Sequence, residues 1–125
     1  MTFSLFLAVA VGGFVGAPSR YLLDRAISRR IESDVPWGTF VVNISGSLLL
    51  GFLTGLTSSG HLSEIGKALL GTGFCGAYTT FSTFSFETVR LLEDGRALDA
   101  AGNVVFSVAA GLAAAGAGLT IGLAM

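Results

Sequence analysis

The sequence predicts an all-helical integral membrane protein, with four membrane-spanning helices in a single domain covering residues 1–125. Apolar residues make up 52% of the chain and charged residues only 12%, whereas soluble domains carry roughly 25% charged residues. The mean hydropathy of +0.77 agrees with a membrane protein. The charges are also clustered, which leaves four uncharged stretches: Met1 to Ser19, Val35 to Gly60, Ala68 to Phe86 and Ala100 to Met125.

Each uncharged stretch is long enough to cross a membrane as a helix. The stretches are 19 to 26 residues long, and about 20 apolar residues span a hydrocarbon core of roughly 30 Å. Because lipid offers the backbone no hydrogen-bond partners, these stretches must be helical despite their glycines. We therefore expect helices at about residues 3–27, 36–57, 65–92 and 98–124, and a multi-pass location in the cell membrane.

The first two predicted helices have recognisable starts. Met1 to Ser4 contains no Lys or Arg, and a signal peptide would need one there, so we interpret the first stretch as a membrane span. Pro36 can open the second helix because the first helical N–H needs no partner. Trp37 beside it suits the headgroup region of the bilayer.

The third predicted helix contains an unusual run from Gly71 to Ser85, followed by the turn signal Asp94-Gly95. Glycines and β-branched hydroxyl residues are concentrated in this run, where a spanning helix should be most regular. We expect a local break near the centre of the helix, which would free backbone carbonyls. Carbonyls freed in this way can hold a cation.

Glycine is abundant, and three pairs among the 18 glycines are spaced four residues apart. Such pairs let helices approach one another closely in membranes. The pairs are Gly12 and Gly16, Gly51 and Gly55, and Gly118 and Gly122. We interpret them as packing surfaces, within the subunit or between subunits.

Charge and composition exclude several classes of function. The predicted spans hold no carboxylate, His or Lys at mid-depth, which removes the usual proton relays and acid–base chemistry, so we expect no enzyme. A net charge of -1 gives no indication of a nucleic-acid partner. Cys75 is the single cysteine and His61 lies in a predicted loop, so neither indicates a disulfide or a metal site.

Polar residues inside the spans are the functional candidates, because a buried polar group in a membrane needs a partner. Asn43 lies mid-way along the second helix with Thr39 on the same face. Its amide either joins helices by a hydrogen bond or lines an ion path. Ser45 and Ser47 are weaker candidates, since a serine can bond to the preceding turn of its own helix.

Four further candidates also have ordinary structural interpretations. Phe81 and Phe84 share one helix face, as many packing pairs do. Ser107 lies four residues after Asn103 and extends a polar stripe on the fourth helix. Arg20 either lies buried at the end of the first helix or extends to the membrane surface.

Three motifs follow one another along the first three helices. They are Gly13-Phe14-Val15-Gly16-Ala17 before Arg20-Tyr21, Pro36-Trp37-Gly38-Thr39 before Asn43 and Gly46, and Gly76 with Thr79-Thr80-Phe81-Ser82-Thr83-Phe84. In order and spacing these motifs resemble the Fluc (CrcB) family of fluoride-specific ion channels. The length of the chain and the number of predicted helices agree with this family.

The resemblance implies an antiparallel, dual-topology dimer that exports fluoride from the cytoplasm through two pores and so lowers its toxicity. A structural sodium ion, which is not transported, would lie at the interface, held by backbone carbonyls of Gly76 and Thr79 from each subunit. The remaining implied roles concern fluoride. Asn43, Thr80, Ser82, Thr83 and Ser107 would be polar pore residues, Phe81 and Phe84 would present ring edges, and Arg20 would lie near an entry vestibule.

The sequence departs from the family pattern at two places. Ala77 stands where many members have a second glycine, and the fourth helix keeps only Ser107 of a longer hydroxyl track. Two other membrane functions remain as alternatives. A small multidrug-type exporter would need a carboxylate in the first helix, which Met1 to Ser19 lacks, and a membrane assembly protein would not need the polar run of the third helix.

Charge distribution bears on the partner subunit. With alternating spans, the segments Arg20 to Asp34 and Glu87 to Asp99 lie on one side and hold six Lys or Arg, whereas the other side holds only Lys67. This bias favours one orientation, with both termini outside. The partner is therefore either an identical chain or a paralogue of opposite charge bias.

Overall fold

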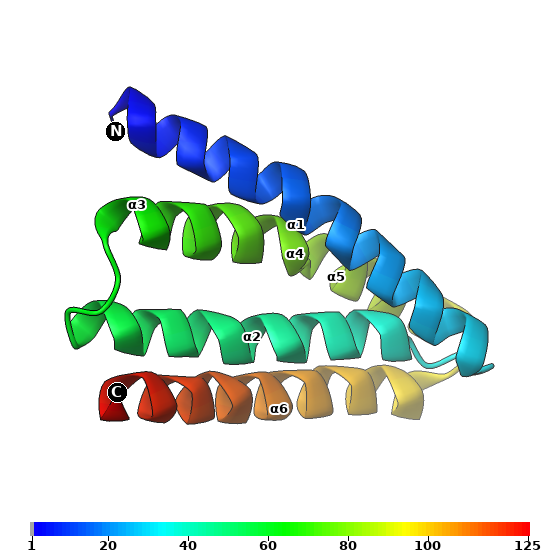
Figure 1. Ribbon diagram of the computed structural model, residues 1–125. Coiled ribbons are helices and arrows are strands. Elements are labelled where there is room, and N and C mark those ends of the chain that lie inside the picture. Colours follow the sequence, from blue (N-terminus) through cyan, green and yellow to red (C-terminus); the bar gives the residue numbers. More distant parts are fainter. Residues whose placement is uncertain (1) are drawn as a thin grey trace.

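The computed structural model describes residues 2–125, and over these residues the chain is helical and without strands. The elements are α1 (Phe3–Arg30), α2 (Trp37–Ser58), α3 (Glu64–Gly66), the π-helical η1 (Lys67–Cys75), α4 (Gly76–Tyr78), α5 (Phe81–Glu93) and α6 (Ala97–Ala124). Figure 1 shows α2 and α6 side by side, with α1 crossing over the segment from α3 to α5.

Three helices, α1, α2 and α6, are each long and apolar enough to cross a membrane, judged over the described residues. The sequence predicted four. The segment expected as the third helix, residues 65–92, is instead divided into α3, η1, α4 and α5. The extended backbones of Thr79 and Thr80 separate α4 from α5, whereas α3, η1 and α4 run on continuously and differ only in the π-type hydrogen bonding of η1.

The ends of the long helices lie close to the predicted ones. The Thr2 hydroxyl accepts a hydrogen bond from the Leu5 N–H at 3.2 Å and so caps α1. At the other end, α1 continues to Arg30 instead of ending near Ile27. Arg29 and Arg30 stabilise this last turn, because cations interact favourably with a helix C-terminus.

Glycines bring the helices into backbone contact. A Cβ at Gly51 would overlap the Ala115 carbonyl of α6, and one at Gly118 would overlap the Leu48 carbonyl of α2. A Cβ at Gly12 would likewise overlap the backbone of η1. The predicted packing role of the paired glycines is therefore confirmed, and the surfaces they form lie within the subunit.

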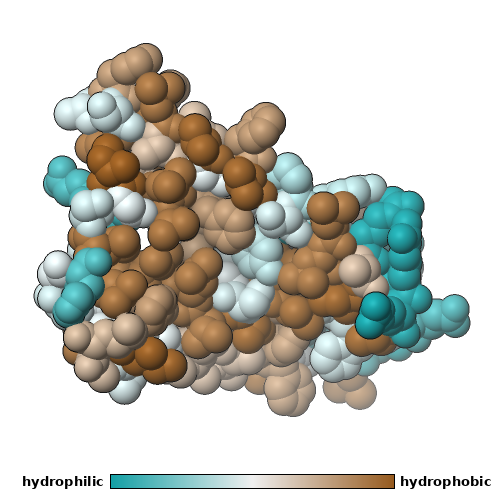
Figure 2. Space-filling view, in the orientation of Figure 1, coloured by the Kyte–Doolittle hydropathy of each residue, from teal (hydrophilic) through white to brown (hydrophobic). Residues whose placement is uncertain are grey.

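Polar and apolar residues separate along the length of the molecule. The connections of residues 31–36 and 94–96 lie at one end, whereas both termini and the connection from α2 to α3 lie at the other (Figure 1). Figure 2 shows a hydrophilic patch at the first of these ends and a predominantly hydrophobic surface over the middle. This pattern is that of a protein whose middle faces lipid.

The charged end is held together by one arginine. Arg96 pairs with Asp34 and, through its Nη2 at 2.6 Å, with Asp99. The hydrogen bond to Asp99 and the charge of Asp34 raise the pKa of the Arg96 guanidinium, so it stays charged at every physiological pH. Together the two ion pairs link the connection after α1 to the start of α6.

Candidate functional site

The most irregular part of the backbone lies between α4 and α5. Thr79 has φ -80° and ψ 156°, and Thr80 has φ -145° and ψ 121°, so both residues are extended between two helices. In a membrane interior, an extended pair leaves backbone groups that need partners from elsewhere. Side chains supply partners for two N–H groups here.

Asn43 on α2 pairs with the backbone of Thr80. The Thr80 N–H donates to Asn43 Oδ1 at 2.8 Å, and Asn43 Nδ2 donates to the Thr80 carbonyl at 2.9 Å. In a continuous helix this N–H would instead donate to the Gly76 carbonyl. Because the Thr80 N–H bonds to Asn43, the Gly76 carbonyl lacks the donor that it would have in a continuous helix.

The hydroxyl of Thr80 has a similar effect one turn later. It caps α5 by accepting from the Thr83 N–H at 3.2 Å. In a continuous helix that N–H would donate to the Thr79 carbonyl. The carbonyls of Gly76 and Thr79 thus both lack their usual partner four residues later, and Gly76 is exposed.

A shallow pocket of about 250 Å³ lies beside the extended pair. Its lining consists of Asn43, Ser47, Leu50, Thr79, Thr80, Phe81 and Phe84. The structure therefore brings together four of the predicted pore residues and one predicted cation ligand. Ser47, a weak candidate by sequence, and Leu50, which nothing in the sequence singled out, complete the lining.

The pocket combines neutral donors with aromatic rings. Asn43 has a second Nδ2 hydrogen beyond the one donated to Thr80, because an amide carries two. The rings of Phe81 and Phe84 lie 5.9 Å apart at 44°, and Phe81 is 79% exposed. The edge of an aromatic ring is positively polarised, so each ring can offer a weak contact to an anion.

A hydroxyl cluster continues from the pocket along the first turn of α5. Thr80 Oγ1 lies 3.1 Å from Thr83 Oγ1 and 3.3 Å from Ser82 Oγ. Ser82 is exposed, whereas Thr80 and Thr83 are partly buried. Three of the four predicted hydroxyl residues are therefore close together, although Ser82 and Thr83 do not line the pocket itself.

Ser107 lies on α6, away from the pocket but connected to it through other polar groups. Its hydroxyl donates weakly to Asn103 Oδ1 at 3.4 Å, and Asn103 Nδ2 donates to Thr88 Oγ1 at 2.9 Å. Thr88 in turn donates to the Phe84 carbonyl at 2.8 Å. Asn103 is only 7% exposed and holds this network together. The sequence placed Asn103 beside Ser107, but it gave no signal for Thr88.

Arg20 is not part of this arrangement. It is partly buried within α1, and none of the side-chain hydrogen bonds found over residues 2–125 involves it. The structure therefore neither joins Arg20 to the pocket nor pairs it with a carboxylate.

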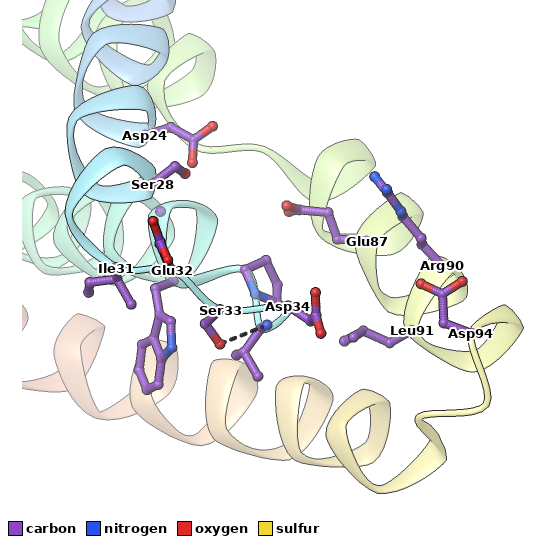
Figure 3. Close-up of a pocket in the computed structure, with 14 residues that line it drawn as sticks. Asp24, Ser28, Ile31, Glu32, Ser33, Asp34, Glu87, Arg90, Leu91 and Asp94 are labelled. Carbon is purple, nitrogen blue, oxygen red and sulfur yellow. Dashed lines mark hydrogen bonds between the residues drawn. The ribbon is translucent and has the colours of Figure 1, made fainter.

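A second pocket, of about 330 Å³, lies at the charged end of the molecule (Figure 3). Asp24 of α1 and Glu87 of α5 extend into it from opposite sides, and Arg90 and Asp94 lie further along α5 and beyond its end. Glu87 Oε1 is buried without a hydrogen-bond partner among the described residues. The sequence prediction missed this pocket because its carboxylates come from segments far apart in the chain.

Comparison with known proteins identifies the family. The family described as "CrcB-like protein, Camphor Resistance (CrcB)" matches residues 7–119. The chain belongs to the CrcB-like family. The match covers most of α1, all of α2 to α5 and most of α6, and it confirms the family resemblance found in the sequence.

Curated relatives of this CrcB-like protein cover nearly the whole chain. One is the fluoride-specific ion channel FluC 1 of Streptomyces avermitilis, which is 54% identical over 91% of this chain and 92% of its own length. FluC 1 of Frankia casuarinae is 48% identical over 96% of this chain and 97% of its own. FluC 1 of Nocardia farcinica is 52% identical over 90% and 77%.

Membership of this family confirms two expectations from the sequence. The family is one of ion channels, so the expectation that the chain is not an enzyme is confirmed. The expected multi-pass location in the cell membrane is also confirmed, by the relatives and by the three helices that can span it.

Proposed function

We propose that this CrcB-like protein is one subunit of a fluoride-specific channel, which lets fluoride leave the cytoplasm down its electrochemical gradient and so lowers its toxicity. One observation carries the proposal. Asn43, Thr80, Phe81 and Phe84, which come from two different helices, line a single pocket, in a chain 54% identical to a protein named as a fluoride-specific channel.

The chemistry of the pocket suits this anion. Fluoride is small and strongly hydrated, so a pore must replace its water with other donors, yet must also release it. A Lys or Arg in the pocket would hold the ion too firmly. Amide, hydroxyl and ring-edge donors carry no net charge, and the pocket is lined by these neutral groups and the apolar Leu50.

The functional unit in this proposal is a dimer of antiparallel subunits with two pores. Its support is the uneven cover of α5, which packs against α6 and α2 but leaves Phe81, Phe86 and Val89 exposed. A second subunit over this side would enclose the shallow pocket and turn it into a path. It would also cover the exposed Gly76.

A structural sodium ion would fit between the two subunits. Gly76 and Thr79 have each lost the N–H partner that a continuous helix provides, and hard cations take oxygen ligands of this kind. Two carbonyls from each subunit would surround the ion. The ion would link the interrupted third helices of the two subunits, and it would not be transported.

The test is ion efflux from liposomes that contain the purified protein, alone or together with a CrcB-like subunit of opposite charge bias. We expect a fluoride gradient to dissipate within the time in which a chloride gradient persists, whereas protein-free liposomes should hold both. Dissipation of both gradients would contradict selectivity. Retention of the fluoride gradient both by the correctly inserted protein alone and by the protein reconstituted with a CrcB-like subunit of opposite charge bias would contradict the channel proposal itself.

The alternatives make different predictions in the same liposomes. A multidrug-type exporter would move organic cations only when a proton gradient is present, and the uncharged first stretch, Met1 to Ser19, lacks the membrane carboxylate that such coupling needs. A membrane assembly protein would move no solute at all. Fluoride efflux without a proton gradient excludes both.

A further inference from the structure

The end of α4 is tied to α2 by a second side-chain contact, between Ser45 and Tyr78. Their hydroxyl oxygens lie 2.8 Å apart. Ser45 Oγ also donates to the Val42 carbonyl at 3.1 Å, so its single hydrogen is already used. The Tyr78 hydroxyl is therefore the donor and Ser45 Oγ the acceptor.

Tyr78 is firmly placed by its surroundings. It is only 9% exposed, and its ring stacks on Phe74 with centroids 5.3 Å apart at 16°. Among the described residues its hydroxyl has Ser45 as its partner. A buried phenol without that partner would cost free energy, so the pair has one favoured geometry.

Gly46 lets the backbone of α2 lie directly against the end of α4. A Cβ there would overlap Thr79 Cγ2 and would lie 3.1 Å from Tyr78 Cδ2. The α2 backbone therefore lies directly against the residues where α4 ends.

These contacts are ordered residue by residue. Ser45, Gly46 and Asn43 meet Tyr78, Thr79 and Thr80 respectively. One turn of α2 thus contacts each of the three consecutive residues at which helix changes to extended chain. α4 continues directly from η1, so the preceding helix sets its direction, and the contacts with α2 lie at the point where that helix ends.

We infer that Ser45 and Tyr78 are positioning residues of the conduction site. Their hydrogen bond fixes the last residue of α4, while Asn43 fixes Thr80 on the other side of Thr79. Between these two anchors the Thr79 carbonyl and the Thr80 hydroxyl can point in one direction only. The inference rests on the proposed fluoride channel and adds the part of the fold that sets the pore geometry.

The test uses Ser45 and Tyr78 and leaves Asn43 unchanged, because Asn43 is itself proposed to contact fluoride. The variants are Ser45→Ala, Tyr78→Phe and the double variant. Thr54→Ala is the matched control, since this exposed threonine of α2 bonds only to its own helix, at the Leu50 carbonyl. The measurement is the unitary fluoride current of single channels in planar bilayers.

Unitary current separates positioning from folding. A variant that merely destabilises the protein yields fewer channels, each with the normal current. A variant that disturbs the site yields channels with a smaller current. A hydrogen bond of ordinary strength corresponds to a change of about threefold to tenfold, so we expect Ser45→Ala to lower the unitary current by that amount.

The two single variants should differ in a defined way. Ser45→Ala leaves the buried Tyr78 hydroxyl without an acceptor, whereas Tyr78→Phe removes the hydroxyl and leaves Ser45 bonded to Val42. We therefore expect Tyr78→Phe to have the smaller effect, and the double variant to match Tyr78→Phe and so restore part of the current lost in Ser45→Ala. Thr54→Ala should carry the normal current.

Two results would overturn the inference. One is a normal unitary current in both single variants. The other is a double variant whose loss is the product of the two single losses, because the hydroxyls would then act independently. Absence of fluoride current in the unaltered protein, both alone and together with a CrcB-like subunit of opposite charge bias, would instead contradict the proposed channel, so the two failures are distinguishable.

Discussion

At the scale of single residues, the sequence nominates Asn43 but cannot assign its partner. Its position mid-way along a helix marked it as either a helix-joining amide or a pore donor. The structure shows it joined to the Thr80 backbone, with one amide hydrogen left over. That pairing depends on how α2 and α5 pack, and no spacing within either segment encodes it.

The aromatic pair gives a prediction at this scale. Replacing Phe81 or Phe84 by Ile keeps apolar bulk but removes the positive ring edge. An edge-to-face contact between two rings is worth about 0.5–1.5 kcal/mol, and with the same scale for an edge contacting fluoride, efflux should fall by up to about tenfold. The measurement is fluoride efflux per subunit from liposomes. Dimer content, measured by cross-linking, should stay unchanged, and full-rate efflux in both variants would refute the role.

Gly46 gives a second residue-scale prediction. In Gly46→Ala the new methyl group would overlap Thr79, and overpacking of this kind costs about 1–3 kcal/mol. We expect a lower thermal midpoint in detergent together with reduced fluoride efflux.

Gly116→Ala is the matched control for this substitution, because a Cβ at Gly116 would meet nothing within 4 Å. It removes a helical glycine as well, which on its own stabilises a helix. A midpoint for Gly46→Ala equal to that of Gly116→Ala would contradict the close contact between α2 and Thr79.

At the scale of elements, α1, α2 and α6 were predictable and the third segment was only partly so. Long uncharged stretches determine membrane helices almost without regard to context, which is why the predicted ends of α2 and α6 lie within a residue of the observed ones. The run from Gly71 to Ser85 predicted a break near the centre of the third helix but did not identify which residues would be extended. Thr79 and Thr80 are the extended residues because Asn43 provides hydrogen-bond partners for the Thr80 backbone there. Nothing in the sequence predicted the π-helical hydrogen bonding of η1.

Removing sodium tests whether the carbonyls near the junction of α4 and α5 hold a structural ion. If a sodium ion is held by the Gly76 and Thr79 carbonyls, replacing it on both faces with a large organic cation should abolish fluoride flux and promote separation of the subunits. The replacement must be on both faces, since one face alone could still supply the ion. Unchanged flux together with unchanged subunit association would contradict the proposal.

At the scale of the whole molecule, the charges are as informative as the helices. The end that carries the connections of residues 31–36 and 94–96 is strongly hydrophilic (Figure 2), and it is the end on which six of the seven Lys and Arg were predicted to gather. The opposite end has Lys67. The structure also shows what the sequence did not, that Arg96 pairs with Asp34 and Asp99 there.

We therefore expect a single orientation, with both termini outside, when the chain is expressed alone. Lys and Arg near short loops resist translocation, so six against one is a strong bias. The measurement is labelling of a cysteine in a terminal tag with a membrane-impermeant reagent, in intact and in opened cells. Cys75 will not interfere, because it is 1% exposed. As a control, substituting Arg29 and Arg30 by Gln and the exposed Ser58 by Lys should increase the inverted fraction.

The orientation decides which partner completes an antiparallel dimer. A chain that inserts in one direction cannot pair antiparallel with itself, so a fixed orientation requires a second CrcB-like subunit whose positive charges gather at the opposite end. In that case the chain expressed alone should give little fluoride efflux, and co-expression with such a subunit should restore it. Equal labelling from both sides, with full efflux from the chain alone, would instead establish the homodimer and show that the carboxylates interspersed with these arginines weaken their bias.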